Sequence, residues 1–150
     1  MLKEGMKAPD FSLPADSGET VRLKDFRGRK VVLYFYPKDM TSGCTVEARN
    51  FRDDLTKFTR KGAVILGVSK DPVKSHVKFR DKEKLNFPLL SDAESDVCEK
   101  YGVWKQKSMY GRTYMGIERT TFVIDADGRI EKIFPKVKID GHCADVLGTL

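Results

Sequence analysis

Cys44 is the side chain of this sequence best placed to act as a nucleophile. It stands between a predicted strand and a predicted helix, in the segment Tyr-Pro-Lys-Asp-Met-Thr-Ser-Gly-Cys-Thr-Val-Glu of residues 36–47. A cysteine in the first turn of a helix faces unpaired backbone N–H groups and the positive end of the helix dipole, and both favour thiolate over thiol. The loop at the carboxyl end of a strand is also the usual ligand site in α/β sheets. The sequence therefore predicts a reactive thiolate at Cys44.

The alternative is that Cys44 is a small buried hydrophobic residue, as a lone cysteine usually is. Three features argue against this interpretation. Gly43 leaves the preceding backbone open, the flanking residues on both sides are polar, and the apolar positions of the helix begin at Val46 instead of Cys44.

Thr41 indicates which chemistry the thiolate serves. A thioredoxin-like reductase carries a C-x-x-C pair, in which one thiol attacks a disulfide and the second releases it. In this sequence the position three residues before Cys44 is Thr41. A hydroxyl cannot resolve a mixed disulfide, but it can hydrogen-bond an oxygen substrate held against the thiolate. The T-x-x-C spacing therefore favours oxygen chemistry over disulfide exchange.

The hydrophobic pattern of the chain predicts the elements that position Cys44. Unbroken apolar runs predict buried strands at 30–36 and 63–68. Helical spacing predicts a helix from Cys44 to about Lys61, with Thr41 and Ser42 available to cap it. Asp71-Pro72 predicts the cap and first residue of a second helix.

The remaining pattern predicts short elements of both kinds. They are a hairpin of 11–13 with 21–23, a strand at 87–90, a helix at 94–101, a hairpin of 121–124 with 129–134, and a helix at 142–150. This alternation predicts one α/β domain over residues 1–150, with a mixed sheet that is parallel in the middle and antiparallel at one side. We expect 105–114 to be a loop, and His76 and His142 to be helix-surface or capping residues.

Composition narrows the functional classes. The excess of 28 Lys+Arg over 22 Asp+Glu is spread evenly along the chain, so we expect no nucleic-acid binding. No apolar run approaches the roughly 20 residues of a membrane span, and residues 1–5 open no signal peptide, so we expect a cytoplasmic protein without membrane contact. Three cysteines suit reduced thiols better than a paired framework, and neither their spacing nor that of the two histidines matches a metal site.

Residues 34–48 closely resemble the P-x-x-x-T-x-x-C motif of peroxiredoxins, in the form of the peroxiredoxin Q or bacterioferritin comigratory protein subfamily. The resemblance extends over nearly the whole chain, through segments 5–11, 65–69, 87–92 and 116–122. It implies a thioredoxin-like three-layer sandwich, with helices and an N-terminal hairpin around a mixed central sheet. It also implies thiol-dependent reduction of hydrogen peroxide and organic hydroperoxides without metal, haem, flavin or other cofactor.

The resemblance also implies roles for individual residues. Cys44 is then the peroxidatic cysteine, Thr41 holds the peroxide, Pro37 shields the pocket from water, and Arg119 lies beside the thiolate. A guanidinium there would stabilise both the thiolate and the negative charge that moves across the breaking O–O bond. Glu47, three residues beyond Cys44 on the same helical face, could hold Arg119 in place.

Recycling departs from the family pattern. Subfamily members that resolve internally carry a second cysteine at positions that correspond here to Arg49 and Arg80. Cys143 belongs to an apolar stripe and Cys98 lies far along the chain, so we expect an external thiol, such as glutathione, glutaredoxin or thioredoxin, to attack the oxidised Cys44. Resolution by Cys98 is the internal alternative.

Two further expectations concern the whole protein. The subfamily resemblance points to a monomer or a weak dimer. A different functional class, a non-enzymatic redox sensor or chaperone-like module, could use the same fold and the same reactive thiol.

Overall fold

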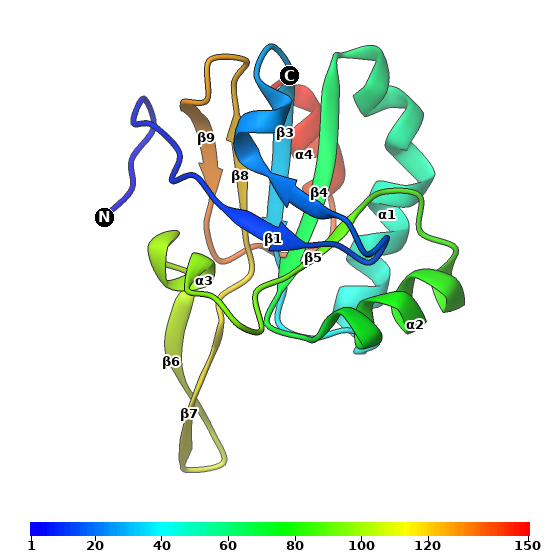
Figure 1. Ribbon diagram of the computed structural model, residues 1–150. Coiled ribbons are helices and arrows are strands. Elements are labelled where there is room, and N and C mark those ends of the chain that lie inside the picture. Colours follow the sequence, from blue (N-terminus) through cyan, green and yellow to red (C-terminus); the bar gives the residue numbers. More distant parts are fainter.

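A five-stranded mixed sheet forms the centre of the computed structural model, which describes residues 1–150 (Figure 1). Its strands, in spatial order, are β5 (Leu89–Ser91), β4 (Ala63–Ser69), β3 (Lys30–Phe35), β8 (Thr120–Ile124) and β9 (Ile130–Phe134). β3 pairs parallel with β4 and antiparallel with β8. The predicted mixed sheet, with parallel pairs on one side of β3 and antiparallel pairs on the other, is therefore confirmed.

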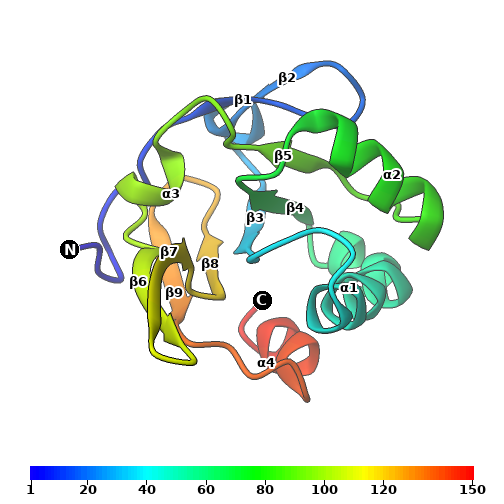
Figure 2. The same cartoon turned by 90° about the horizontal axis from the view of Figure 1, so that it is seen from below.

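Both faces of the sheet are covered. One face carries α1 (Ser42–Arg60), α2 (Val73–Glu83) and α4 (His142–Gly148). The opposite face carries β1 (Ser12–Pro14), β2 (Thr20–Arg22), the 3-10 turn η1 (Leu23–Phe26) and α3 (Val97–Lys100) (Figure 2). Each layer buries its own hydrophobic cluster against the sheet, with 18 residues on the β1 side and 16 on the α1 side. This is the expected three-layer α/β sandwich.

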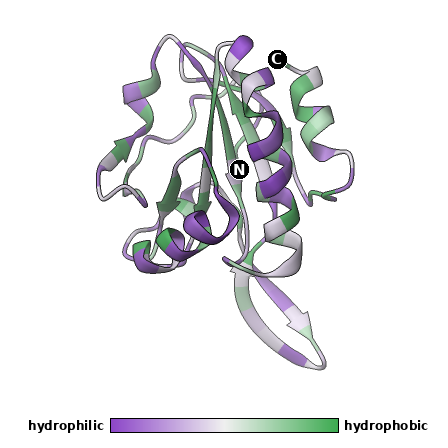
Figure 3. Ribbon diagram, turned by 90° about the vertical axis from the view of Figure 1, so that its right-hand side faces the viewer, coloured by the Kyte–Doolittle hydropathy of each residue, from purple (hydrophilic) through white to green (hydrophobic).

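The buried face of α1 begins two residues earlier than the sequence pattern predicts. Val46 is 46% exposed, whereas Cys44, Ala48, Phe51 and Phe58 are buried at helical spacing. Cys44 therefore lies on the apolar stripe, and the prediction that the stripe begins at Val46 is wrong. Figure 3 shows hydrophilic residues on the outward side of the long helix, with hydrophobic strands behind it.

The segment expected to be a loop at 105–114 is a hairpin instead. β6 (Trp104–Met109) and β7 (Arg112–Ile117) pair antiparallel around Tyr110 and Gly111, which both have positive φ. Two such residues form the primed type of turn that suits a hairpin. Most side chains of the hairpin are exposed, so no alternation of apolar and polar residues marks it in the sequence. Figure 1 shows it projecting from the sheet.

Other differences are smaller. α2 begins at Val73 with Pro72 at the N-cap position, and the Asp71 carboxylate is engaged elsewhere. β5 and α3 begin later than predicted. No helix has the length and apolar character needed to cross a bilayer.

The prediction for both histidines is wrong, because His76 and His142 are buried at 0% and 5% exposure. The Nε2 atom of His142 lies 2.8 Å from the Thr121 hydroxyl. Burial lowers the pKa of His142 to about 4, so its ring is neutral near pH 7.

Candidate active site

Cys44 lies in the first turn of α1, directly after the loop of residues 36–41 that leaves the carboxyl end of β3. The Thr41 carbonyl accepts a hydrogen bond from Thr45 N at 2.9 Å, which closes the first helical turn around Cys44. The thiol is 2% exposed. The helix N-terminus therefore directs its dipole at a sulfur atom that is almost removed from water.

Arg119 reaches the sulfur from a distant part of the chain. It lies between β7 and β8, 75 residues after Cys44, and its Nη2 donates to Cys44 Sγ at 3.4 Å. Its Nη1 donates to Glu47 Oε1 at 2.6 Å. The Arg119 carbonyl is itself held by Val137 N at 2.9 Å. One planar guanidinium thus bridges the thiol and the carboxylate one turn further along α1.

Burial and the neighbouring charge of Arg119 shift the pKa of Glu47 in opposite directions. Its side chain is 2% exposed, and burial raises its pKa to about 7 although Arg119 opposes the shift. Oε2 has no hydrogen-bond partner, so only one carboxylate oxygen is satisfied. The structure places Glu47 where the sequence argument expected it, against Arg119.

Gly43 permits the close approach of Arg119. A Cβ atom at this position would lie 3.4 Å from Arg119 Nη2 and 3.2 Å from Ile139 Cδ1. Any side chain beyond Cβ would therefore compete with the guanidinium for the space in front of Cys44. Gly43 therefore allows this packing, and it also leaves the backbone before Cys44 open.

Thr41 occupies the N-cap position of α1 without capping it through its side chain. Its hydroxyl donates to the Lys38 carbonyl at 2.9 Å, which leaves the oxygen lone pairs of an exposed side chain free to accept. Pro37 is half-buried at the start of the same loop. Thr41 is thus an exposed hydrogen-bond acceptor three residues before Cys44.

A buried polar network behind the loop escaped the sequence analysis. Asp39 is 5% exposed and accepts hydrogen bonds from Tyr36 and Ser75. His76 Nδ1 lies 2.6 Å from the same carboxylate. Asp39, Asp71 and His76 offer ligand-type atoms within 4.8 Å of one another, but hydrogen bonds already use these groups. The local sequence pattern around His76 gave no signal of this arrangement.

The other two cysteines lie in different surroundings. Cys98, on α3, belongs to the hydrophobic cluster on the opposite face of the sheet from Cys44. Cys143, on α4, shares the Cys44 side, and its thiol donates to Asp54 Oδ2 at 3.5 Å. All three cysteines are free and buried.

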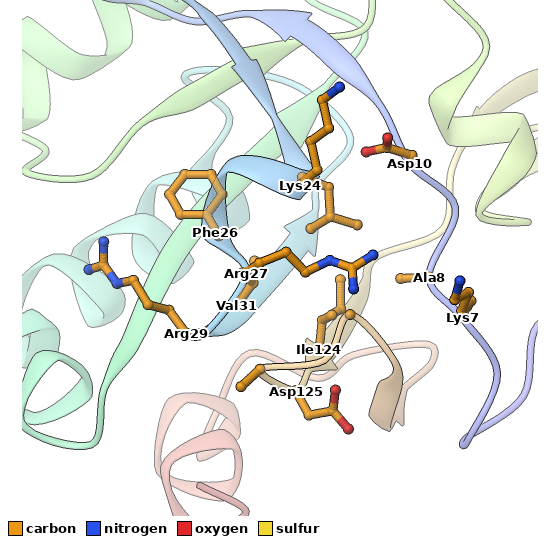
Figure 4. A pocket seen from close by; sticks show the side chains of 13 residues that line it. Lys7, Ala8, Asp10, Lys24, Phe26, Arg27, Arg29, Val31, Ile124 and Asp125 are labelled. Atoms are coloured by element: carbon orange, nitrogen blue, oxygen red, sulfur yellow. The ribbon is translucent and has the colours of Figure 1, made fainter.

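Two cavities of the structure lie away from Cys44. One, of about 320 Å³, lies at the opposite end of β3 and is lined by Val31, Ile124 and several basic residues (Figure 4). Arg27 extends through the middle of this view, and its Nη1 already donates to the Asp127 carbonyl at 2.9 Å. This cavity is therefore separate from the site at Cys44, which lies at the other end of β3.

Comparison with known proteins agrees with this geometry. Residues 5–133 match the model of the AhpC/TSA family. The chain is 54% identical to a putative peroxiredoxin bcp of Coxiella burnetii, over 99% of both chains. It is 53% identical to peroxiredoxin Bcp of Bacillus subtilis, over 99% of this chain and 95% of the relative.

Solved structures give the same result for the fold. Xanthomonas campestris bacterioferritin comigratory protein, studied for its alkyl peroxide reduction activity, superimposes with a TM-score of 0.90 at 40% identity, over 97% of this chain and 96% of that chain. A mutant of Xylella fastidiosa PrxQ superimposes with a TM-score of 0.93 at 37% identity, over 99% and 94% of the two chains.

Proposed function

Because the chain belongs to the AhpC/TSA family and is a thiol peroxidase of the peroxiredoxin Bcp type, we propose that Cys44 is its peroxidatic residue and that Thr41, Pro37, Arg119 and Glu47 form the site around it. The observation that carries this assignment is the guanidinium of Arg119, which contacts both Cys44 Sγ and Glu47. A cation held there favours the thiolate, which is the reactive form.

The first step is attack of the Cys44 thiolate on the terminal oxygen of a hydroperoxide. The S–O bond forms as the O–O bond breaks, and the leaving oxygen takes a proton to become water or an alcohol. Sulfur is oxidised to the sulfenic acid and the peroxide is reduced by two electrons. Arg119 stabilises the charge that develops on the two oxygens, and Thr41 accepts the hydrogen bond of the peroxide O–H.

An external thiol returns Cys44 to its starting state. A thiolate attacks the sulfenic sulfur and water leaves, which produces a mixed disulfide; a second thiol then releases Cys44 as the thiol. Thioredoxin, glutaredoxin and glutathione all supply this chemistry. We place the reaction in the cytoplasm, since the cycle consumes reduced thiols and all three cysteines are unpaired.

Peroxide turnover tests the assignment. With dithiothreitol as reductant, the wild-type protein should consume hydrogen peroxide and a small organic hydroperoxide catalytically, while Cys44→Ser should show only the background rate. Cys98→Ser and Cys143→Ser are matched controls that remove a thiol outside the site and should keep most of the rate. Equal consumption by wild type and Cys44→Ser would refute the role of Cys44.

A further inference from the structure

Both oxygens of the buried Asp39 carboxylate have hydrogen-bond partners beneath the loop that carries Thr41. The Tyr36 hydroxyl donates to Oδ1 at 2.6 Å and the Ser75 hydroxyl donates to Oδ2 at 2.7 Å. His76 Nδ1 lies 2.6 Å from Oδ2, so a proton lies between the ring and the carboxylate. A carboxylate buried in this way depends on its partners, because an unpaired buried charge is costly.

His76 joins three elements through one side chain. The ring belongs to α2 and is 0% exposed. Its Nε2 lies 2.9 Å from the Leu90 carbonyl of β5, and a carbonyl only accepts, so Nε2 carries a proton and donates. Its Nδ1 faces Asp39 in the loop. Both ring nitrogens are therefore used, which a ring buried for packing alone would not require.

The loop itself needs external support. Asp39 stands midway between Pro37 and Thr41, and its amide also donates to Asp71 Oδ2 at 2.8 Å. The next residue, Met40, has φ of 63°, a left-handed conformation that is uncommon for residues other than glycine. Such a conformation persists when the surrounding contacts impose it. Contacts at Asp39 thus determine where the chain enters α1.

We propose that His76 is a positioning residue for peroxide reduction, which acts through Asp39 to hold the loop of residues 37–41 so that Thr41 faces the peroxide beside Cys44. This inference rests on the proposed function of Cys44 and Thr41. The ring does not touch the reacting atoms. It keeps the acceptor oxygen of Thr41 in place during the attack, when small displacements are most costly.

Two substitutions of His76 test the contributions of its two ring nitrogens separately. The amide nitrogen of His76→Asn falls near the position of Nδ1 and can still donate to Asp39, whereas that of His76→Gln falls near Nε2 and reaches Leu90 instead. We expect His76→Gln to lower the second-order rate constant of Cys44 oxidation by hydrogen peroxide by about tenfold or more, the loss typical of one hydrogen bond to a charged group. His76→Asn should restore most of the rate.

The rate at which iodoacetamide alkylates Cys44 separates a positioning role of His76 from a merely structural one. Alkylation does not need Thr41, so its rate should change by less than about twofold in His76→Gln while peroxide oxidation falls. Lys74→Gln, an exposed change on the same helix, is the control for general effects on α2. Ser75→Ala removes another donor to Asp39 and should slow peroxide oxidation by about threefold, which keeps the test open if His76→Gln does not fold.

Several outcomes would overturn the inference. They are equal peroxide rates in wild type and His76→Gln, equal losses in the Gln and Asn variants, or losses of peroxide oxidation and alkylation in the same proportion. If the wild type itself shows no peroxide oxidation above Cys44→Ser, the proposed function fails along with it. The two failures are therefore distinguishable.

Discussion

At the scale of single residues, the proposed reactivity of Cys44 depends on three short-range contributions. In the proposed site the helix N-terminus and the Arg119 guanidinium next to Sγ stabilise the thiolate, and Thr41 offers the substrate an acceptor. Arg119 is 16% exposed and is paired with a buried carboxylate, so its contribution is only weakly screened by solvent. Each contribution can be removed separately.

Thr41→Val preserves the shape of the side chain and removes only the hydroxyl. We expect a fall of about 10- to 100-fold in the rate constant for peroxide oxidation, as for loss of a hydrogen bond formed in the transition state. Stopped-flow mixing with hydrogen peroxide measures it. Thr41→Ser, which keeps the hydroxyl, should retain most of the rate, and an unchanged rate in Thr41→Val would exclude Thr41 from peroxide binding.

The raised pKa of Glu47 predicts that the stability of the folded protein depends on pH. Burial raises its pKa from the ordinary 4.5 to about 7, so the folded chain binds this proton more tightly than the unfolded chain. This tighter proton binding stabilises the folded protein by up to about 3 kcal/mol. The stabilisation is complete below pH 4.5 and is lost as the pH rises through 7. Glu47→Gln cannot titrate, so urea unfolding should show its stability rising relative to wild type between pH 4.5 and 8. Parallel pH profiles would contradict this.

At the scale of elements, α2 is fastened to its neighbours at the positions where the subfamily pattern would place a resolving cysteine. Arg49 of α1 pairs with Glu83 of α2 at 2.6 Å, and Arg80 of α2 pairs with Asp16 at 3.0 Å. Both arginines are partly exposed, so each pair contributes modestly by itself. Together with His76 they hold α2 along its length.

The placement of the remaining thiols predicts how oxidised Cys44 is recycled. Cys98 lies across the sheet, and the pKa of the Cys98 thiol is raised well above its ordinary value by burial and by Asp92. Burial and Asp54 raise the pKa of Cys143 to about 12. Both thiols therefore resist becoming the attacking thiolate. After one equivalent of peroxide, mass spectrometry should detect a Cys44 sulfenic acid, about 16 Da heavier, or a mixed disulfide with added thiol.

An internal disulfide would give the opposite result. It would appear as a loss of about 2 Da, mapped by peptide digestion to Cys44 with Cys98 or Cys143 and abolished by the corresponding serine variant. Finding the Cys44–Cys98 species would mean that α3 unfolds locally during the cycle, because the two sulfurs start on opposite faces of the sheet.

At the scale of the whole molecule, both hydrophobic clusters pack against the same sheet, which supports one domain over residues 1–150. Large apolar side chains at the surface are concentrated on the β6–β7 hairpin, namely Met109, Tyr110, Tyr114 and Met115. Figure 1 shows the hairpin projecting away from the sheet, and the subfamily resemblance points to a monomer or a weak dimer.

We therefore expect a monomer or a weak dimer in solution. Sedimentation velocity across a wide concentration range should show a species of monomer mass at low concentration, with self-association weakened further by Tyr110→Ser. Tyr110 is 97% exposed, so its replacement should leave the fold and peroxide turnover unchanged. A stable decamer would contradict this expectation.

The sequence by itself determined the fold class of this protein and singled out the candidate reactive segment. The P-x-x-x-T-x-x-C spacing, the unbroken apolar strands and the helix after Cys44 are local properties, and local spacing follows directly from the residues. Arg119 was reached only through the family resemblance, since nothing within its own segment connects it to Cys44.

The tertiary structure alone decided the remaining features. The buried face of α1, the hairpin at 104–117 and the role of His76 all depend on what packs against them. The sheet separates Cys98 from Cys44, and it brings Arg119 to a sulfur 75 residues away. Contacts of this kind join segments that are distant in sequence, and chain topology sets them instead of local periodicity.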